Sequence, residues 1–292
     1  MCSSDLGADG EVSELFSSEG NVVNPAVAPD GRSILLTTLD ERRRMRVWQY
    51  DIDRDVLNPI LPLGIQSHLT VWLPDGSGFV ATTNQHGPSN LYLVNLENNA
   101  APQRLTENEN HQDGASFSPD GRILSYAEVD PETNWDLWLL NMETLETTPF
   151  LATVAEEIQP IISPNGQLIA YTSNETGTRK VYLQNFPQGG GKQLVSVDGG
   201  EDPLWSEDGS LLYFRWEDKM FKVSIEWQEG LKISRPTELY QGEFEGRVGY
   251  GQSNWDLLPG GDGFIFSSVR SLKLEQQINV MTNWRRETEP EP

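Results

Sequence analysis

The stretch GASFSPDGRILSYAEVDPETNWDLWLLN, residues 114–141, decides the fold. Segments 115–118, 123–128 and 136–141 have the length and alternating apolar pattern of short strands. The first two are joined by Pro-Asp-Gly at 119–121, in which Pro sets φ near about −65°, Asp accepts a bond from the downstream backbone and Gly takes the left-handed conformation. Strands this short cannot bury a face alone, so they must stack on copies of themselves.

The copies are present along the whole chain. The turn recurs at 29–31, 74–76, 119–121, 164–166 (with Asn in place of Asp), 207–209 and 261–263. Its central residues are separated by 45, 45, 45, 43 and 54 positions. A period of about 40 to 45 residues with several strands is typical of a β-propeller blade. The sequence therefore predicts an all-β, six-bladed β-propeller of four-stranded antiparallel blades.

The repeat also predicts the domain boundaries. We expect one propeller over residues 11–284, preceded by a disordered or artefactual leader at 1–10 and followed by a disordered tail at 285–292. The blades are expected at about 24–61, 69–106, 114–151, 159–196, 202–240 and 254–284. The last of these lacks a fourth strand, whereas the strand at 11–17 has no local partner. We expect this N-terminal strand to complete the last blade and close the ring.

Composition narrows the class of partner. The 292 residues carry 21 Lys and Arg against 44 Asp and Glu, a formal net charge of −23. Such a surface repels phosphate backbones, so nucleic acid is not expected as a partner. The single cysteine, Cys2, excludes an internal disulfide, and no apolar run approaches the roughly 20 residues of a membrane-spanning helix. We expect a monomer that does not insert into a membrane.

The turns and their flanking strands resemble the WD40-like PD40 repeats of TolB-like six-bladed propellers over residues 11–284. A narrower resemblance lies in VYLQNFPQGGGK at 181–192, PLWS at 203–206 and INVMTNW at 278–284. These segments are similar to the C-terminal sensor propeller of bacterial membrane-bound serine/threonine protein kinases. The resemblance implies a periplasmic or extracytoplasmic sensing or protein-interaction module of a bacterial signalling protein.

Two other roles remain open at this stage. One is a stand-alone TolB-like periplasmic scaffold for envelope protein complexes. The other is the gating propeller of a prolyl-oligopeptidase-type peptidase whose hydrolase domain is not in this chain. The sequence has no Gly-x-Ser-x-Gly elbow and none of the kinase catalytic loops. We therefore predict a binding module without chemistry of its own, and not an enzyme.

The expected binding site lies where the innermost strands begin, because the loops before these strands converge on one mouth of a propeller's central channel. The candidate residues are His68, His111, Asp113, Glu201, Asp202 and Tyr250. The insertion at 241–254 is a candidate lid. The mainly negative charge favours a cationic peptide or protein segment, or a small ligand. A divalent ion in the channel is less favoured, because no ligand spacing is diagnostic, and no cofactor is predicted.

Overall fold

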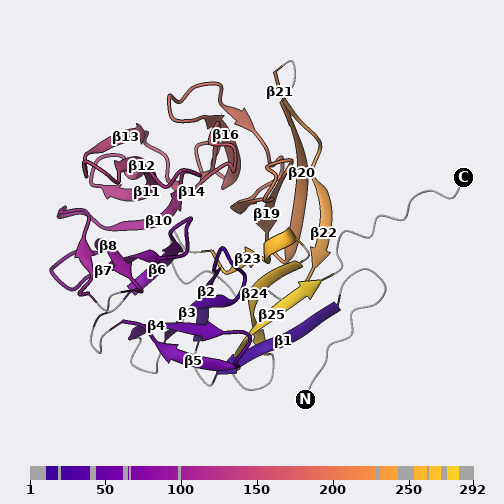
Figure 1. The fold of residues 1–292 in the computed structure, drawn as a ribbon. Helices are drawn as coiled ribbons and strands as arrows, with labels where there is room; N and C mark the ends of the chain where they lie inside the picture. Colours follow the sequence, from indigo (N-terminus) through magenta and orange to yellow (C-terminus); the bar gives the residue numbers. More distant parts are fainter. Residues whose placement is uncertain are drawn as a thin grey trace, which may run out of the picture.

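A computed structural model describes the chain at residues 11–18, 21–39, 44–61, 65, 67–97, 100–227, 230–242, 253–261, 263–270 and 275–282. The chain is an all-β propeller of four-stranded antiparallel sheets arranged around a common centre (Figure 1). Its one described helical segment is a single turn, η1 (Pro259–Gly261). No helix in the described part is long and apolar enough to span a membrane. The predicted leader at 1–10 and tail at 285–292 lie outside the described residues.

Each sheet takes its name from its innermost strand. The β2 sheet contains β2 (Asn21–Val27), β3 (Ser33–Leu39), β4 (Met45–Asp51) and β5 (Val56–Pro59). The β6 sheet contains β6 (Ser67–Trp72), β7 (Gly78–Thr83), β8 (Asn90–Asn95) and β9 (Gln103–Arg104). The β10 sheet contains β10 (Gln112–Phe117), β11 (Ile123–Asp130), β12 (Asn134–Asn141) and β13 (Thr147–Leu151). The β14 sheet contains β14 (Glu157–Ile162), β15 (Leu168–Ser173), β16 (Lys180–Asn185) and β17 (Gln193–Leu194).

The remaining two sheets depart from this simple order. The β18 sheet contains β18 (Glu201–Trp205), β19 (Leu211–Trp216), β20 (Lys219–Trp227), β21 (Leu231–Ile233) and β22 (Thr237–Gln241). The β23 sheet contains β23 (Trp255–Leu257), β24 (Gly263–Arg270), β25 (Glu275–Thr282) and β1 (Glu11–Ser18).

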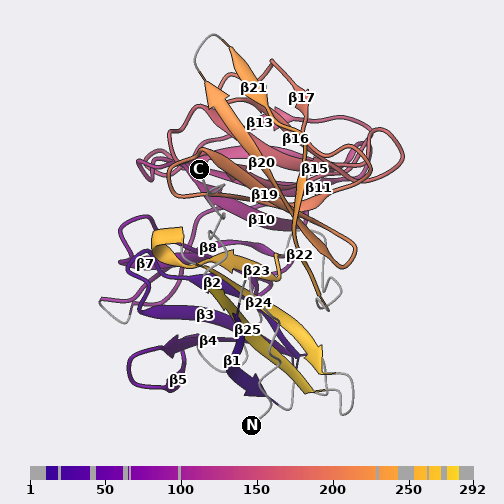
Figure 2. The same ribbon diagram turned by 90° about the vertical axis from the view of Figure 1, so that its right-hand side faces the viewer.

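The expected count of four strands needs correction in the β18 sheet. Strand β20 is long enough to pair with β22 along its first half and with β21 at its far end (Figure 2). The reason is that Leu231 and Ile233 pack against the apolar cluster shared by the β14 and β18 sheets. This local contact adds a short fifth strand that the repeat does not predict.

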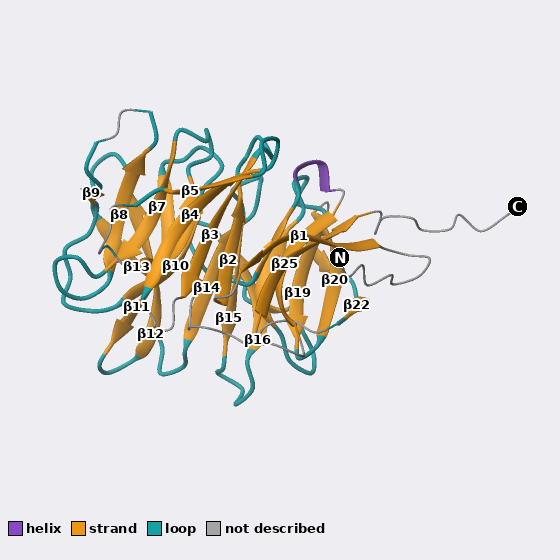
Figure 3. Ribbon diagram, turned by 90° about the horizontal axis from the view of Figure 1, so that it is seen from below, coloured by secondary structure: helices purple, strands orange, loops and turns teal. Residues whose placement is uncertain are grey.

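The repeated turns form as the sequence predicts. In the turn at 119–121 the N–H of Gly121 donates to the carbonyl of Ser118 at 2.8 Å, and the N–H of Arg122 donates to Asp120 Oδ1 at 3.1 Å. Gly121 has φ of 69°, the left-handed conformation that a side chain disfavours. All such turns join the first and second strand of a sheet, so they lie on one face of the molecule, the turn face. The innermost strands begin on the opposite face, the mouth face (Figure 3).

The turns also pack against one another around the turn face. The proline of each turn approaches the glycine of the next: Pro29 faces Gly76, Pro74 faces Gly121, Pro119 faces Gly166 and Pro164 faces Gly209. Where Glu207 replaces proline, its carboxylate instead accepts the N–H of Gly260 at 2.8 Å. Pro259 then packs on Gly31, so the series returns to the first sheet.

Apolar side chains fill the junctions between neighbouring sheets. Leu35 and Val47 of the β2 sheet pack with Trp72 and Phe79 of the β6 sheet, and all four are buried. Every junction of this kind places the apolar face of one sheet on that of the next, which explains why strands too short to fold alone are stable here. The first and last sheets are joined as well, since the N–H of Val27 donates to Asp256 Oδ2 at 2.8 Å.

Strand β1 pairs antiparallel with β25, with Glu11 opposite Thr282 and Ser18 opposite Gln276. The sequence predicted this pairing, and it brings the N-terminal strand to the outside of the last sheet. Val12 and Leu15 of β1 pack against apolar clusters of the β23 and β2 sheets.

Candidate functional site

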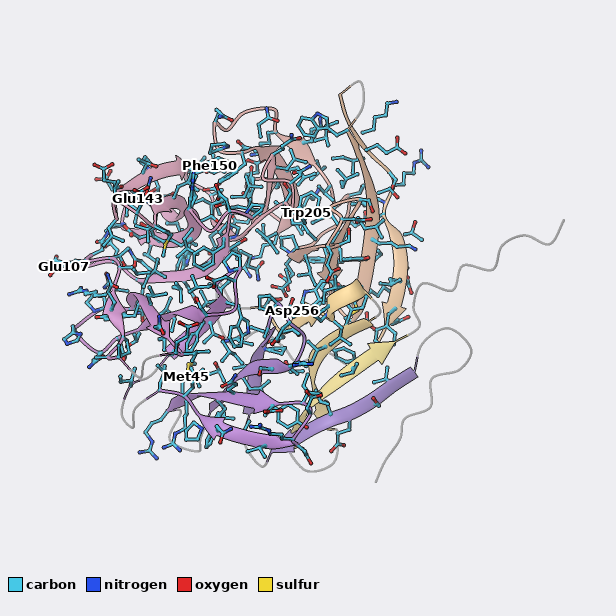
Figure 4. The ribbon with its side chains drawn as sticks, viewed as in Figure 1. Met45, Glu107, Glu143, Phe150, Trp205 and Asp256 are labelled. Carbon is cyan, nitrogen blue, oxygen red and sulfur yellow. The ribbon has the colours of Figure 1, made fainter. Side chains whose placement is uncertain are left out.

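The innermost strands of all six sheets line a central cavity with a volume of about 240 Å³. Each strand contributes at least one residue to its wall, for example Asn24, Thr70, Gly114, Gln159, Asp202 and Trp255. Asp256 also lines the cavity and lies near the middle of the ring, far from outer residues such as Glu107 and Glu143 (Figure 4). The cavity wall is therefore a mixture of apolar groups and a few carboxylates.

A backbone irregularity recurs at this wall. Asn24, Gly114, Gln159 and Asp202 have φ of 54°, 55°, 56° and 55°, in the left-handed region that Gly, Asn and Asp adopt most readily and that a Gln side chain disfavours. At each of them the pairing between the first and second strand shifts register. Such bulges bend a strand and redirect its side chains. They turn polar groups of the innermost strands toward the neighbouring sheet and the channel.

Gln159 and Asp202 are joined across two sheets by this irregularity. The amide Nε2 of Gln159 donates to Asp202 Oδ1, and the N–H of Asp202 donates to Gln159 Oε1 at 3.0 Å. Thr172 donates to the same Oε1 at 2.8 Å, and the indole of Trp255 donates to the carbonyl of Asp202 at 3.1 Å. Burial raises the pKa of Asp202 to about 6, opposed by the charges of Arg215 and Arg179.

A second polar group surrounds Arg179 on the mouth face. Its guanidinium lies 3.0 Å from Glu156 Oε2 and 4.0 Å from Glu201 Oε2. Arg215 lies opposite Glu201 in the pairing of β18 with β19 and is buried. Burial raises the pKa of Glu201, with a further contribution from the charge of Asp202. The buried Asp202 and the part-buried Glu201 thus lie beside two arginines at one side of the channel.

The structure places the predicted site residues in different environments. Asp202 lines the cavity, and Glu201 faces the arginines beside it. Asp113 is buried, and its Oδ1 accepts the N–H of its neighbour Gly114 at 2.9 Å. His111 is exposed, and its carbonyl accepts the N–H of Val129.

The side chains of the other two predicted residues lie outside the described part of the structure. His68 belongs to β6, but its side chain is outside the described part of the structure. Tyr250 and most of the candidate lid at 241–254 lie outside the described residues. The six predicted residues therefore remain a prediction, with Asp202 the member that the structure places in the cavity wall.

Sequence reasoning missed Gln159, Arg179 and Asp256. A signal for Gln159 exists, because it stands 45 positions after Gly114 and occupies the same place in the repeat. Arg179 and Asp256 carry no such signal, since their partners come from other strands.

No family model matches the chain. An uncharacterized protein of Agrobacterium fabrum is 22% identical over 162 residues, covering 51% of this chain and 55% of that protein. A tricorn-like protease C-terminal subunit of Sulfurisphaera tokodaii is 24% identical over 161 residues, covering 53% of this chain and 18% of that protein. The matches thus span about half of the first relative's length and about a fifth of the second's.

Solved structures show the same fold. A TolB-type protein of Agrobacterium tumefaciens has a TM-score of 0.68 at 15% identity, covering 93% of this chain and 97% of that one. TolB of Acinetobacter baumannii has a TM-score of 0.62 at 13% identity, covering 90% and 64%. The chain therefore has a TolB-like propeller fold. The finer resemblance to kinase-linked sensor propellers is not among these findings and stays a prediction.

The prediction that the chain is not an enzyme is overturned. An oligogalacturonate lyase of Vibrio parahaemolyticus (TM-score 0.58, 14% identity, 94% and 98% coverage) and a gluconolactonase of Xanthomonas campestris (0.65, 12%, 94% and 89%) share the propeller fold. Neither the absence of a nucleophile elbow nor the absence of kinase loops excludes activity in a fold that enzymes use.

Proposed function

We propose that the chain is a binding propeller whose channel mouth receives a cationic segment of a protein partner. The carrying observation is the cavity wall, in which Asp202 and Asp256 supply carboxylates among otherwise largely apolar residues. Glu201 and Glu156 lie on the adjoining mouth face. These four acids outnumber the two arginines beside them, Arg179 and Arg215. A concave opening with net negative charge attracts a positive guest, and the net charge of −23 acts in the same direction.

The biological setting proposed for this binding is sensing or protein interaction in a bacterial signalling protein, in the periplasm or another extracytoplasmic space. The TolB-like fold supports protein binding, and the motifs at 181–192 and 278–284 support the link to signalling. The scaffold role in envelope complexes is supported by the same fold.

A second candidate function has its own support. The chain matches part of a tricorn-like protease subunit, and a puromycin-hydrolysing peptidase of Mycobacterium tuberculosis shares the fold over 85% of this chain but only 42% of its own length, with a TM-score of 0.62 at 17% identity. A propeller attached to a peptidase would use the same mouth as a substrate gate.

The domain organisation belongs to this proposal: one closed ring of six blades over residues 11–284. Its support is the series of six sheets, the β1–β25 pairing, the bond from Val27 to Asp256, and the contact of Pro259 with Gly31. We propose that the ring acts as a monomer.

A charge-matched pair of variants tests the binding site. Glu201→Gln with Asp202→Asn removes two negative charges from the mouth face, and Glu143→Gln with Glu146→Gln removes two exposed charges near the turn face. We expect fluorescence anisotropy with a labelled octalysine peptide to show about fivefold weaker binding for the mouth variant and little change for the control. Equal weakening in both variants, at unchanged melting temperature, would refute the proposed site and leave only diffuse charge attraction.

A further inference from the structure

Two buried carboxylates meet at the junction between the β10 and β14 sheets, away from the central cavity. Asp136 lies near the start of β12, and Glu157 is the first residue of β14. Their side chains are almost inaccessible, with exposed fractions of 2% and 0%. Trp135 and Ile158, their chain neighbours, belong to one apolar cluster that fills this junction. The two acids therefore sit in an environment that strongly disfavours uncompensated charge.

A single residue holds both carboxylates. The hydroxyl of Thr153 donates to Glu157 Oε1 at 2.7 Å, and its backbone N–H donates to Asp136. The hydroxyl of Thr133 donates to Asp136 Oδ2 at 2.6 Å, and that of Ser173 to Glu157 Oε1 at 3.4 Å. All of these donors are neutral. The shared contact with Thr153 brings the two carboxylates near one another.

One oxygen of each carboxylate has no partner. Asp136 Oδ1 and Glu157 Oε2 are buried and accept no hydrogen bond from the described residues. Neither acid forms an ion pair within the described part of the chain. The amine of Lys192, whose charge acts on Glu157, is paired with Glu175 and lies over the ring of Tyr182. A buried carboxylate oxygen without a donor is costly, and two of them beside each other are more so.

The neighbouring junction, between the β6 and β10 sheets, contains a buried acid whose two oxygens both accept hydrogen bonds. Glu128 of β11 is also buried, but Asn108 donates to its Oε1 at 2.6 Å and Gln112 to its Oε2 at 2.7 Å. Both of its oxygens are satisfied by the protein. The comparison indicates that Asp136 and Glu157 are arranged for something other than a closed hydrogen-bond network.

A bound cation would compensate Asp136 Oδ1 and Glu157 Oε2 at once. Both carboxylates are buried and the donors that contact them are neutral, so two bare charges are poorly compensated here. A proton on one acid would still leave the other with an unpaired oxygen, because no hydrogen bond joins the two carboxyl groups among the contacts of the described residues. Hard divalent cations, by contrast, prefer carboxylate, hydroxyl and water oxygens, and calcium accepts irregular sets of them.

We propose that Asp136 Oδ1 and Glu157 Oε2 bind a calcium-class divalent cation, with the hydroxyl oxygens of Thr133 and Thr153 and solvent as further ligands. The cation joins the β10 and β14 sheets and so stabilises the junction between two repeats. This site is independent of the proposed binding at the channel mouth, since neither acid lines the central cavity.

Calcium titration of the full chain tests the site. After treatment with EDTA and gel filtration, calcium chloride at about 100 times its dissociation constant should raise the melting temperature by about 5 °C. The double variant Asp136→Asn with Glu157→Gln should show no calcium response. Glu128→Gln, which alters a buried acid whose oxygens are already bonded, should keep the full response.

Terbium provides a second readout that does not depend on stability. Terbium replaces calcium in oxygen sites, and the buried indole of Trp135 beside Asp136 should sensitise its emission. We expect emission in the wild type and in Glu128→Gln, and its loss in the double variant. A wild type that gives neither a melting shift nor sensitised emission, or responses that persist in the double variant, would overturn the proposal and leave the pair occupied by a proton or water alone.

Discussion

The two faces of the propeller are built on different principles. On the turn face five junctions repeat one contact, the proline of one turn against the glycine of the next, and at the sixth Glu207 accepts the N–H of Gly260 instead. On the mouth face neighbouring junctions use unrelated polar groups. One holds Glu128 between two amides, the next holds the Asp136 and Glu157 pair, and the one after it centres on Arg179.

The difference separates the contacts that repeat with the fold from the contacts that can vary with function. Contacts on the turn face join residues at fixed positions of successive repeats, and each turn is itself a local structure, so copying the repeat copies the contact. Contacts on the mouth face join residues from different strands and sheets, so each can change without disturbing the repeat. A fold of this kind can vary its mouth while its turn face keeps the ring together, which agrees with the range of proteins that share it.

The largest expected effect comes from removing the strand that joins the chain's two ends. Deletion of residues 1–18 removes β1 and exposes the edge of β25 (Glu275–Thr282). If the ring depends on this pairing, the melting temperature should fall by about 10 °C or more, and the exposed edge should promote aggregation. Calorimetry and size-exclusion chromatography measure both.

Removal of residues 285–292, the predicted tail, is the control and should change neither property. A monomeric β1 deletion with wild-type melting would mean that the turn face alone closes the ring through Pro259 and Gly31.

A smaller effect tests the closing contact of the turn face. A Cβ on Gly31 would lie 2.9 Å from Pro259 Cγ, and Gly31 also has φ of 69°. Gly177, in a loop of the mouth face, has φ of 86° but open space around it. Both Gly→Ala changes therefore add backbone strain, whereas only Gly31→Ala adds a clash. We expect Gly31→Ala to lower the free energy of unfolding by about 3 kcal/mol and Gly177→Ala by about 1 kcal/mol. Urea unfolding measures both free energies. Equal losses in the two variants would show that the clash with Pro259 costs no stability.

Sequence reasoning succeeded on the turn face and was incomplete on the mouth face, for the same physical reason. The turns at 29–31, 74–76, 119–121 and 164–166 are local signals, and each forms the hydrogen bond that the residue types predict. The pairing of β1 with β25 was also predictable, because the N-terminal strand had no local partner and the last blade lacked a fourth strand.

The candidate site depends on contacts that sequence does not display. Glu201 and Asp202 were found as acids at the start of a strand, but Gln159 and Arg179, which fix them, lie on another sheet. The contact of Asp136 with Glu157 passes through Thr153, a loop residue with no recognisable pattern around it. The extra strand β21 likewise depends on packing against a cluster of two sheets.

The smallest predicted effect is a difference in pH dependence between the two faces. Burial raises the pKa of Asp202 from 3.8 to about 6, so the native chain holds a proton that the unfolded chain has lost over this window. The free energy of unfolding should therefore decrease as the pH rises from about 4 to 6. Asp202→Asn keeps an oxygen to accept the amide of Gln159 and tolerates the positive φ, but it cannot titrate. We expect it to remove part of this decrease, about 1 kcal/mol after allowance for the lost attraction to Arg179 and Arg215.

Asp120 on the turn face should behave with the opposite sign. Hydrogen bonds from Ser118 and from the backbone of Arg122 lower its pKa, so its contribution is present above its ordinary pKa of 3.8 and is lost as the pH falls through the lowered value. Asp120→Asn should therefore weaken the fold at neutral pH and make little difference in strong acid, whereas Asp202→Asn should help most above about pH 6. Chemical unfolding of both variants and the wild type at about pH 2, 4, 6 and 8 measures the two slopes, that of Asp120 below about pH 4 and that of Asp202 above it. Slopes of the same sign would show that burial at the channel does not set the ionisation of Asp202, and that its carboxylate is stabilised by the arginines beside it.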